Sequence, residues 1–330
     1  MYFGQALLRR EDNRFLKGKG RYTDDLTLAN MAFAAFVRST HAHATINSIN
    51  IIDAKSKPGV LAVLTNEDWS ADKMGELPCV HPMTSNDGRF MNEKLRPIFA
   101  KDKVCHVGEV IACVIAKTKN QALDGVEAVQ LEYGPLPANT VIGKSLDVDA
   151  TIIHPEFSNN VVFEIDRGDA ESTENAFKDA FHISEMTLIS NRVAGSPMEP
   201  RSFLAKYEES TGRYSLWCTS QIPHYFRRWL AKFVLFEAEH RIRVVSPDVG
   251  GGFGLKIHLN EGAIVTWAAK RLACPVKWTA TRHESFLSDS QARDHHTTAR
   301  MAFDREGKII GMEVDTIAAL GGYLSQFAPS

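Results

Sequence analysis

The sequence predicts an α+β protein in which an α/β unit is followed by a larger mixed region. Short apolar stretches with alternating side chains, typical of strands, are interleaved with segments of helical periodicity. The stretch Gly134-Pro135-Leu136-Pro137 interrupts both patterns and predicts a domain boundary. The length of 330 residues, with 44% hydrophobic and 24% charged side chains, is sufficient for two domains with cores of their own.

The first region consists of a polar lead-in at 1–20 and an α/β unit at 21–133. A helix is expected to start near Asp68 and another to run over 120–129. Because the set of strands and helices is complete before the proline break, we expect this unit to fold independently and a linker to extend over 134–150. The strands are expected at 31–38, 45–52, 59–65, 110–116 and 130–133.

The second region, 151–330, is expected to contain two hairpins. Glu209-Ser210-Thr211-Gly212 has the turn composition that joins two antiparallel strands, and residues 304–307 have it as well. The two hairpins therefore pair 204–208 with 214–219 and 298–303 with 309–318. The other expected elements are strands at 161–165, 183–190 and 241–245, a helical turn at 174–180 and a helix at 222–235.

The glycine-rich stretch at 246–256 is the part of the chain that packing alone explains least. It reads SPDVGGGFGLK, with four glycines in the five positions 250–254. Glycine gives up side-chain contacts and costs conformational entropy, so such a run is kept mainly where positive φ or a close backbone approach is needed. Apolar residues at helical spacing follow, among them Ile264, Trp267 and Ala268. We therefore expect a strand, loop and helix unit whose free N–H groups and helix dipole face an anionic or oxo group.

Two common nucleotide-binding loops do not fit these letters. The dinucleotide fingerprint needs glycine at its first, third and sixth positions, but the frame that starts at Gly252 has Ile257 in sixth place. The frame that starts at Gly250 has Leu255 there. A P-loop needs lysine between glycine and Ser or Thr, whereas Lys256 lies between leucine and isoleucine. The sequence therefore predicts neither type of nucleotide site.

The run GGGFGLK, with RVVSPDV before it, resembles the cofactor loop of the molybdenum-binding large subunit of the xanthine dehydrogenase, aldehyde oxidase and carbon monoxide dehydrogenase family. The stretches at 198–201 and 292–295 favour the carbon monoxide dehydrogenase-like bacterial branch. The resemblance implies an α/β hammerhead domain at 21–133 and the first part of the molybdopterin-binding α+β domain at 151–330. Six further stretches match the family in the same order, at 14–25, 38–44, 107–109, 167–169, 197–201 and 220–221.

The resemblance also assigns residues to the cofactor. Gln221 matches the family's glutamine beside the metal and is the predicted catalytic residue, because its neutral amide can donate a hydrogen bond to an oxo ligand. The implied cofactor is molybdenum–molybdopterin in its cytosine dinucleotide form, and no residue of this chain is predicted to ligate the metal. The residues that match the cofactor-binding loop, whose backbone N–H groups face the cofactor, are Gly251, Gly252, Phe253 and Gly254.

Three other sets of side chains each allow two interpretations. Lys256 either neutralises a phosphate of the dinucleotide or caps the loop. Arg201 and Glu199 suggest an ion pair that is either part of the site or purely structural. His41 and His43 would share one face of a strand and could bind a metal, but no third ligand is evident.

As the resemblance implies, the protein is an oxidoreductase that oxidises an aldehyde, carbon monoxide or an N-heterocycle and passes electrons to an iron–sulfur small subunit and an FAD-binding medium subunit. Ile257 stands where xanthine-type members carry glutamate, which disfavours a purine. The family's subunit is more than twice as long, and its general base is expected beyond Ser330, so Glu261 is not assigned that role. We expect the 330-residue chain alone to hold little molybdenum and to be inactive. The alternative is a non-catalytic fragment or assembly module.

Charge, hydropathy and cysteine content exclude other classes of protein. The formal net charge of −2 and the scattered aromatic residues provide no basic stripe for a nucleic acid. The longest apolar runs, at 31–37 and 110–116, are far shorter than the roughly 20 residues that cross a bilayer, so no membrane span is predicted. The five cysteines are odd in number and have no CxxC spacing, which indicates reduced thiols and no iron–sulfur cluster. A cytoplasmic location is expected.

Overall fold

A seven-stranded sheet crosses the predicted domain boundary in the computed structural model, which describes residues 3–328. The strand order is β10-β9-β8-β11-β1-β5-β3. The first region joins the second through a short parallel pair, in which Ala32 lies opposite Val276 and Phe33 opposite Lys277. These strands are β1 (Ala32–Arg38), β3 (Val60–Thr65), β5 (Val110–Ala116), β8 (Ser202–Glu208), β9 (Arg213–Cys218), β10 (Ile242–Val245) and β11 (Val276–Thr279).

The strands and helices predicted for the first region are present. Strand β5 is completely buried, and the helix after β3 starts with a capping box in which the Thr65 hydroxyl accepts from the Glu67 N–H and the Asp68 carboxylate accepts from the Thr65 N–H. The remaining elements are α1 (Asp12–Leu16), α2 (Ile52–Ser56), α3 (Asn66–Ala71), α4 (Lys119–Glu127), and a small sheet of β2 (Ala44–Asn50), β4 (Lys103–Val104) and β6 (Gln130–Pro135) in the order β4-β2-β6.

The predicted break at Gly134 and Pro135 lies inside a strand, because β6 continues through Pro135. Proline is tolerated there since β6 is at the edge of its sheet and needs no further N–H donor. The hydrophobic core is likewise continuous across the boundary: Trp69 of α3 meets Trp267 edge to face, with ring centroids 5.1 Å apart. Independent folding of 21–133 remains a prediction, and the shared sheet and core oppose it.

Helix α7 (Asn260–Arg271) is the central helix of the second region and has ten buried residues. It packs on β8, and the close approach requires Gly262, where a Cβ would come within 2.7 Å of the Phe203 ring. Helix α6 (Pro223–Trp229) continues into a π-helical turn at Leu230–Val234, which together correspond to the predicted helix at 222–235. Helix α8 (Arg282–Ser288) follows β11.

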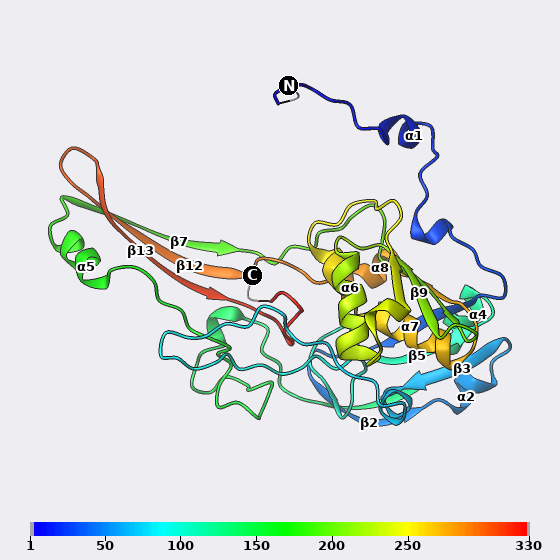
Figure 1. Ribbon diagram of the computed structural model, residues 1–330. Coiled ribbons are helices and arrows are strands. Elements are labelled where there is room, and N and C mark those ends of the chain that lie inside the picture. Colours follow the sequence, from blue (N-terminus) through cyan, green and yellow to red (C-terminus); the bar gives the residue numbers. More distant parts are fainter. Residues whose placement is uncertain (1–2, 329–330) are drawn as a thin grey trace.

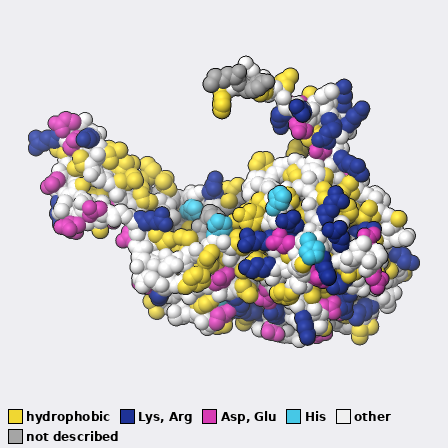
Figure 2. Space-filling view, viewed as in Figure 1, with side chains coloured by type: hydrophobic (Ala, Val, Ile, Leu, Met, Phe, Trp, Pro, Cys, Tyr) yellow, Lys and Arg dark blue, Asp and Glu magenta, His cyan; other side chains and the backbone are white. Residues whose placement is uncertain are grey.

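A three-stranded antiparallel sheet projects from the body as an arm (Figure 1). Its strands β7 (His182–Ser190), β12 (His295–Phe303) and β13 (Ile309–Ala318) run in the order β13-β12-β7. Helix α5 (Ala170–Lys178), capped by Asp169, packs on one face. The prediction of a strand at 161–165 is wrong, because this segment is irregular. Its Val162 carbonyl accepts a hydrogen bond from the Asn92 N–H. Figure 2 shows hydrophobic side chains gathered along the arm. The exposed hydrophobic residues of its strands include Met186, Leu188, Met312 and Val314.

Between residues 3 and 328 no helix is both long and apolar enough to cross a membrane. All five cysteines are free thiols, and Cys79, Cys113 and Cys218 are buried. Burial raises the pKa of these three thiols, which keeps them protonated and unreactive.

The segment after β13 returns to the body, where the buried ring of His258 lies 2.8 Å through Nδ1 from the Gln326 Oε1. The pKa of His258 is lowered from 6.5 to about 4, chiefly by desolvation and also by the nearby Arg96 and Arg201. The hydrogen bond with Gln326 and the charge of Glu261 oppose this shift. As the pH falls, His258 is therefore protonated at a higher pH in the unfolded chain than in the folded protein. Stability from the neutral ring is complete above pH 6.5 and lost as the pH falls toward 4, by about 3 kcal/mol.

We expect His258→Gln to lose less stability than the wild type when the pH is lowered from 7 to 4.5. Urea unfolding of both proteins at the two pH values measures this difference, and carboxylates that titrate in both proteins cancel from it. Parallel pH dependences in the two proteins would contradict the assignment.

Candidate functional site

The glycine loop leaves β10 at the edge of the seven-stranded sheet, and each of its glycines has a structural reason. Gly251 and Gly254 have φ values of 95° and 87°, a left-handed conformation that favours glycine. At Gly250 a Cβ would come within 2.5 Å of the Glu199 Cβ, and at Gly252 within 2.5 Å of the Gln221 Cδ. Phe253 is also left-handed, with φ 51°, and is 74% exposed. Two of the four glycines thus provide left-handed conformations, and the other two allow close approaches.

Gln221 lies directly against this loop. Its backbone N–H donates to the Lys256 carbonyl at 3.1 Å, and its side-chain Oε1 accepts from the Gly254 N–H, also at 3.1 Å. The structure therefore brings the predicted catalytic residue to the predicted cofactor-binding residues. Because Oε1 is engaged and the Nε2 group has no partner among the described residues, Gln221 presents an amide donor beside the loop.

Three consecutive backbone donors remain available in the loop. Within residues 3–328, the N–H groups of Gly251, Gly252 and Phe253 have no hydrogen-bond partner, whereas those of Gly250 and Gly254 are held by side chains. Consecutive unpaired N–H groups in a left-handed turn form a concavity that suits oxygen atoms with negative charge. The donor set of the loop and Gln221 therefore fits an oxygen-rich group such as an oxo-metal centre.

The expected helix dipole does not contribute to this site. The loop passes into a single 3-10 turn at Leu255–Ile257, and α7 starts only at Asn260, which is buried. Glu261 in the first turn of α7 is also buried and forms ion pairs with two arginines, as described below. The prediction that this helix end faces an anion is wrong, because the start of α7 lies in the core rather than at the loop.

Lys256 points into the protein and is completely buried. Its Nζ lies 2.9 Å from Glu199 Oε2, so it does not neutralise a phosphate, and its role is close to the predicted capping of the loop. Burial lowers the pKa of Lys256, while Glu199 opposes this shift by stabilising the charged form. The ammonium thus depends on its carboxylate partner.

Arg201 does not pair with Glu199, contrary to the sequence expectation. It donates to Glu261 and, through Nε at 2.6 Å, to Asp289, and all three residues are buried. Arg38 completes the cluster, with 2.9 Å to Glu261 and 2.8 Å to Glu284. Burial raises the pKa of Glu261, but Arg201 and Arg38 more than compensate and hold it well below its ordinary value. Glu261 is thus a permanently ionised core residue, consistent with its exclusion as a base.

Sequence reasoning missed this buried cluster. A signal was present, because Glu261 lies just before the apolar part of its helix and Arg38 ends an apolar strand. A charge in such a place needs a buried partner. The partner itself could not be named, since several acidic residues were equally available along the chain.

The predicted lead-in contains α1 and reaches the base of the loop through Arg14. Arg14 of α1 donates through Nη2 to Asp248 Oδ1 at 2.7 Å, and the Asp248 N–H donates to the Arg21 carbonyl at 3.1 Å. The hydrogen bond from Arg14 lowers the pKa of Asp248 to about 2. Asp248, two residues before the first loop glycine and paired with Arg14 of α1, thus ties the two segments together.

The two candidate metal-binding histidines are used structurally. His43 is buried with Nδ1 2.7 Å from the Pro137 carbonyl oxygen, and the ring of His41 lies 4.4 Å from that of Tyr133. Neither lies within a strand. In the described part of the chain no group of three or more His, Cys, Asp or Glu side chains is arranged to hold a metal ion.

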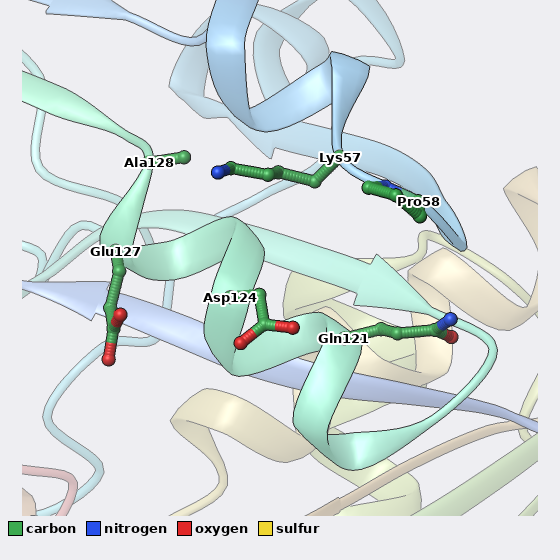
Figure 3. Close-up of a pocket in the computed structure, with 6 residues that line it drawn as sticks. All are labelled: Lys57, Pro58, Gln121, Asp124, Glu127 and Ala128. Atoms are coloured by element: carbon green, nitrogen blue, oxygen red, sulfur yellow. The ribbon is translucent and has the colours of Figure 1, made fainter.

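A hollow of about 540 Å³ lies elsewhere, between α4 and the turn after α2 (Figure 3). Figure 3 shows Asp124 and Gln121 projecting from α4 and Lys57 reaching across from the turn. None of the predicted site residues lines it, so it does not belong to the glycine loop. Its lining residues are Lys57, Pro58, Gln121, Asp124, Glu127 and Ala128.

Fold and loop together define a cofactor-binding subunit of two linked modules, and comparison with known proteins identifies both. Residues 17–137 match the a/b hammerhead domain of aldehyde oxidase and xanthine dehydrogenase, and residues 153–330 match the molybdopterin cofactor-binding domain. The chain belongs to the xanthine dehydrogenase, aldehyde oxidase and carbon monoxide dehydrogenase family of molybdenum-binding large subunits, as the resemblance indicated.

Individual relatives agree with this assignment. The carbon monoxide dehydrogenase large chain of Afipia carboxidovorans is 34% identical over 98% of this chain and 40% of its own length. The nicotine 6-hydroxylase large subunit of Paenarthrobacter nicotinovorans is 34% identical over 97% and 38%. Among solved structures, the reconstituted CO dehydrogenase from Oligotropha carboxidovorans superposes with a TM-score of 0.87 at 33% identity, covering 95% of this chain and 39% of that one. The chain thus spans about two fifths of the length of these relatives.

Proposed function

We propose that this chain contributes the glycine loop and Gln221 to the active site of a molybdopterin-dependent oxidoreductase. The observation that carries the proposal is the contact between Gln221 Oε1 and the Gly254 N–H, which turns the side-chain amide donor outward beside three unpaired backbone N–H groups. Membership of a molybdopterin cofactor-binding domain family supports the same conclusion.

When bound, the molybdenum cofactor would supply the two-electron oxidation of the substrate. This chain's residues would hold and orient it: Gly251, Gly252 and Phe253 through backbone N–H groups and Gln221 through its amide donor. A neutral donor stabilises negative charge on an oxygen atom without competing for the metal. We extend the proposal to the cytosine dinucleotide form of the cofactor, in line with the resemblance of the loop.

The proposed substrate class rests on the names of the relatives and on one position, 257, where this chain differs from xanthine-type members. Their names refer to carbon monoxide, nicotine and xanthine, and the matching hammerhead family is named for aldehyde oxidase, so we propose an aldehyde, carbon monoxide or an N-heterocycle. Ile257, in the place of the glutamate of xanthine-type members, makes a purine the least favoured of these. Relatives named as large chains or complex subunits support a multi-subunit assembly, for which we propose iron–sulfur and flavin subunits as electron acceptors in the cytoplasm.

Metal and pterin analysis of the purified protein, together with the subunits that copurify with it, tests the proposal. We expect little molybdenum in the 330-residue chain alone but molybdenum and pterin in the wild-type assembly. In the Gly252→Ala assembly we expect at least a several-fold loss, because the added methyl group would displace Gln221. Gly143→Ala is the matched control, since its Cβ would meet nothing closer than 3.5 Å. A wild-type assembly without molybdenum and pterin would overturn the proposal and favour the non-catalytic module.

A further inference from the structure

We propose that Glu199 is the positioning residue of the glycine loop, because a single carboxylate oxygen holds the loop at both ends. The sequence suggested only an ion pair of Glu199 with Arg201, whereas in the structure Glu199 pairs with Lys256. The inference deepens the proposed function, on which its cofactor-related part rests, and its structural part stands on the loop alone.

The two donors that contact this oxygen lie at opposite ends of the loop. We call the contacts of Glu199 with Gly250 and Lys256 the bracket. Glu199 Oε2 accepts from the Gly250 N–H at 2.7 Å and from the Lys256 ammonium at 2.9 Å. The five residues 251–255 lie between these two anchors, including the three with unpaired N–H groups. The Glu199 N–H also donates to the Gly250 carbonyl at 3.2 Å, so the first anchor is held through backbone and side chain.

Burial makes these contacts strong and specific for a charged carboxylate. Lys256 has no exposed surface, and the Glu199 side chain is 11% exposed. Hydrogen bonds between ionised partners are about twice as strong as neutral ones, and a buried charge that loses its partner is costly. Glutamine at 199 would keep an oxygen that can accept from both donors but would leave the Lys256 ammonium without its counter-charge.

The segment that carries Glu199 is itself fixed to the body of the protein. Arg282, in the first turn of α8, donates through Nη2 to the Met198 carbonyl at 3.1 Å and to the Pro197 carbonyl at 2.5 Å. A Cβ on Gly251 would come within 3.2 Å of the Pro197 Cβ, so the loop rests on this segment. Helix α8 thus fixes the position of residues 197–199, and these residues fix the position of the loop.

The bracket also explains why the loop keeps its donors free. Glu199 engages only the two ends, and Gln221 engages the Gly254 N–H, so the turn is held without using the N–H groups of residues 251–253. A loop held in this way loses little further conformational entropy when it binds a cofactor, which is how preorganisation increases affinity.

Hydrogen exchange of the 330-residue chain tests the bracket without any cofactor. In Glu199→Gln we expect amide exchange in peptides that cover 250–256 to accelerate about tenfold or more, while exchange in the arm strand β12 stays unchanged. Glu306→Gln, a change in the exposed turn of the arm, is the matched control and should leave the loop unchanged. Unchanged loop exchange in Glu199→Gln, or an equal acceleration in loop and arm, would overturn the proposal.

A second variant, at Lys256, tests whether the two side chains act together or whether Glu199→Gln merely disrupts the local structure. Lys256→Met should also loosen the loop, because it removes one of the two anchors. Combined with Glu199→Gln it should loosen the loop less than the sum of the two single effects, since no uncompensated buried charge remains. Strictly additive effects would show that the two side chains do not act as one bracket.

The proposed effect of Glu199 on cofactor binding is measured separately, through the pterin content. In the assembled protein, Glu199→Gln should lower the pterin content several-fold relative to wild type. A loosened loop with unchanged pterin content would overturn the positioning role toward the cofactor. A loosened loop in a protein whose wild type holds no pterin would instead overturn the proposed function and leave the bracket intact.

Discussion

Replacing Arg201 by leucine should lower the free energy of unfolding by about 3–5 kcal/mol, the usual loss when one partner of a buried ion pair is removed. The Arg201 side chain is 2% exposed and holds Glu261 and Asp289, whose side chains are 3% and 5% exposed. Leucine would leave Asp289 without a cation and Glu261 with Arg38 alone. Urea unfolding at pH 7 measures the loss.

Two further variants sharpen this prediction. Arg305→Leu removes an exposed arginine from the turn of the arm and should change stability by no more than about 0.5 kcal/mol. Arg201→Lys keeps the charge but not the planar fork that reaches two carboxylates, so an intermediate loss is expected. If Arg201→Leu costs no more than the Arg305 control, the cluster does not stabilise the core.

The pH dependence of the cluster follows from the direction of the Glu261 pKa. Because the folded-state pKa lies below its ordinary value, the contribution of Glu261 is complete above the unfolded value of about 4.3 and is lost as the pH falls below it. The stability difference between wild type and Arg201→Leu should therefore narrow in acid.

Gln221→Ala should lower the turnover of the assembled enzyme about a hundredfold, or roughly 3 kcal/mol, while lowering the molybdenum content far less. Under the proposed function, the Gln221 amide would be an oriented donor to an oxygen atom of the cofactor, and such a donor acts mainly on the reacting state. The structure adds a second consequence, because alanine also releases the Gly254 N–H. Steady-state kinetics normalised to molybdenum separates turnover from cofactor loss.

Gln221→Glu distinguishes the two consequences. A carboxylate keeps the acceptor for the Gly254 N–H but replaces the amide donor, so turnover should fall about as far as in the alanine variant while the loop stays ordered in hydrogen exchange. Gln130→Ala, on an exposed strand of the small sheet, is the matched control. Normal turnover in both Gln221 variants would remove this residue from the site.

The sequence by itself determined most of the local structure. Strand β5 follows from a short apolar run, the hairpin of β8 and β9 from its turn residues, and the helix after Thr65 from the helix-start residue Asp68. These signals act over a few positions. The family, the glycine loop and Gln221 were likewise readable, because a loop that must approach other groups closely needs glycine whatever surrounds it.

Only the tertiary structure decided which distant groups meet. The pairing of β1 with β11 joins the two regions into one sheet, and no local pattern encodes the partner of a strand so far along the chain. The same holds for charges: Arg201 pairs with Glu261 and Asp289 rather than with the neighbouring Glu199, which is left for Lys256. Sequence shows that a buried charge needs a partner, but the path of the chain selects it.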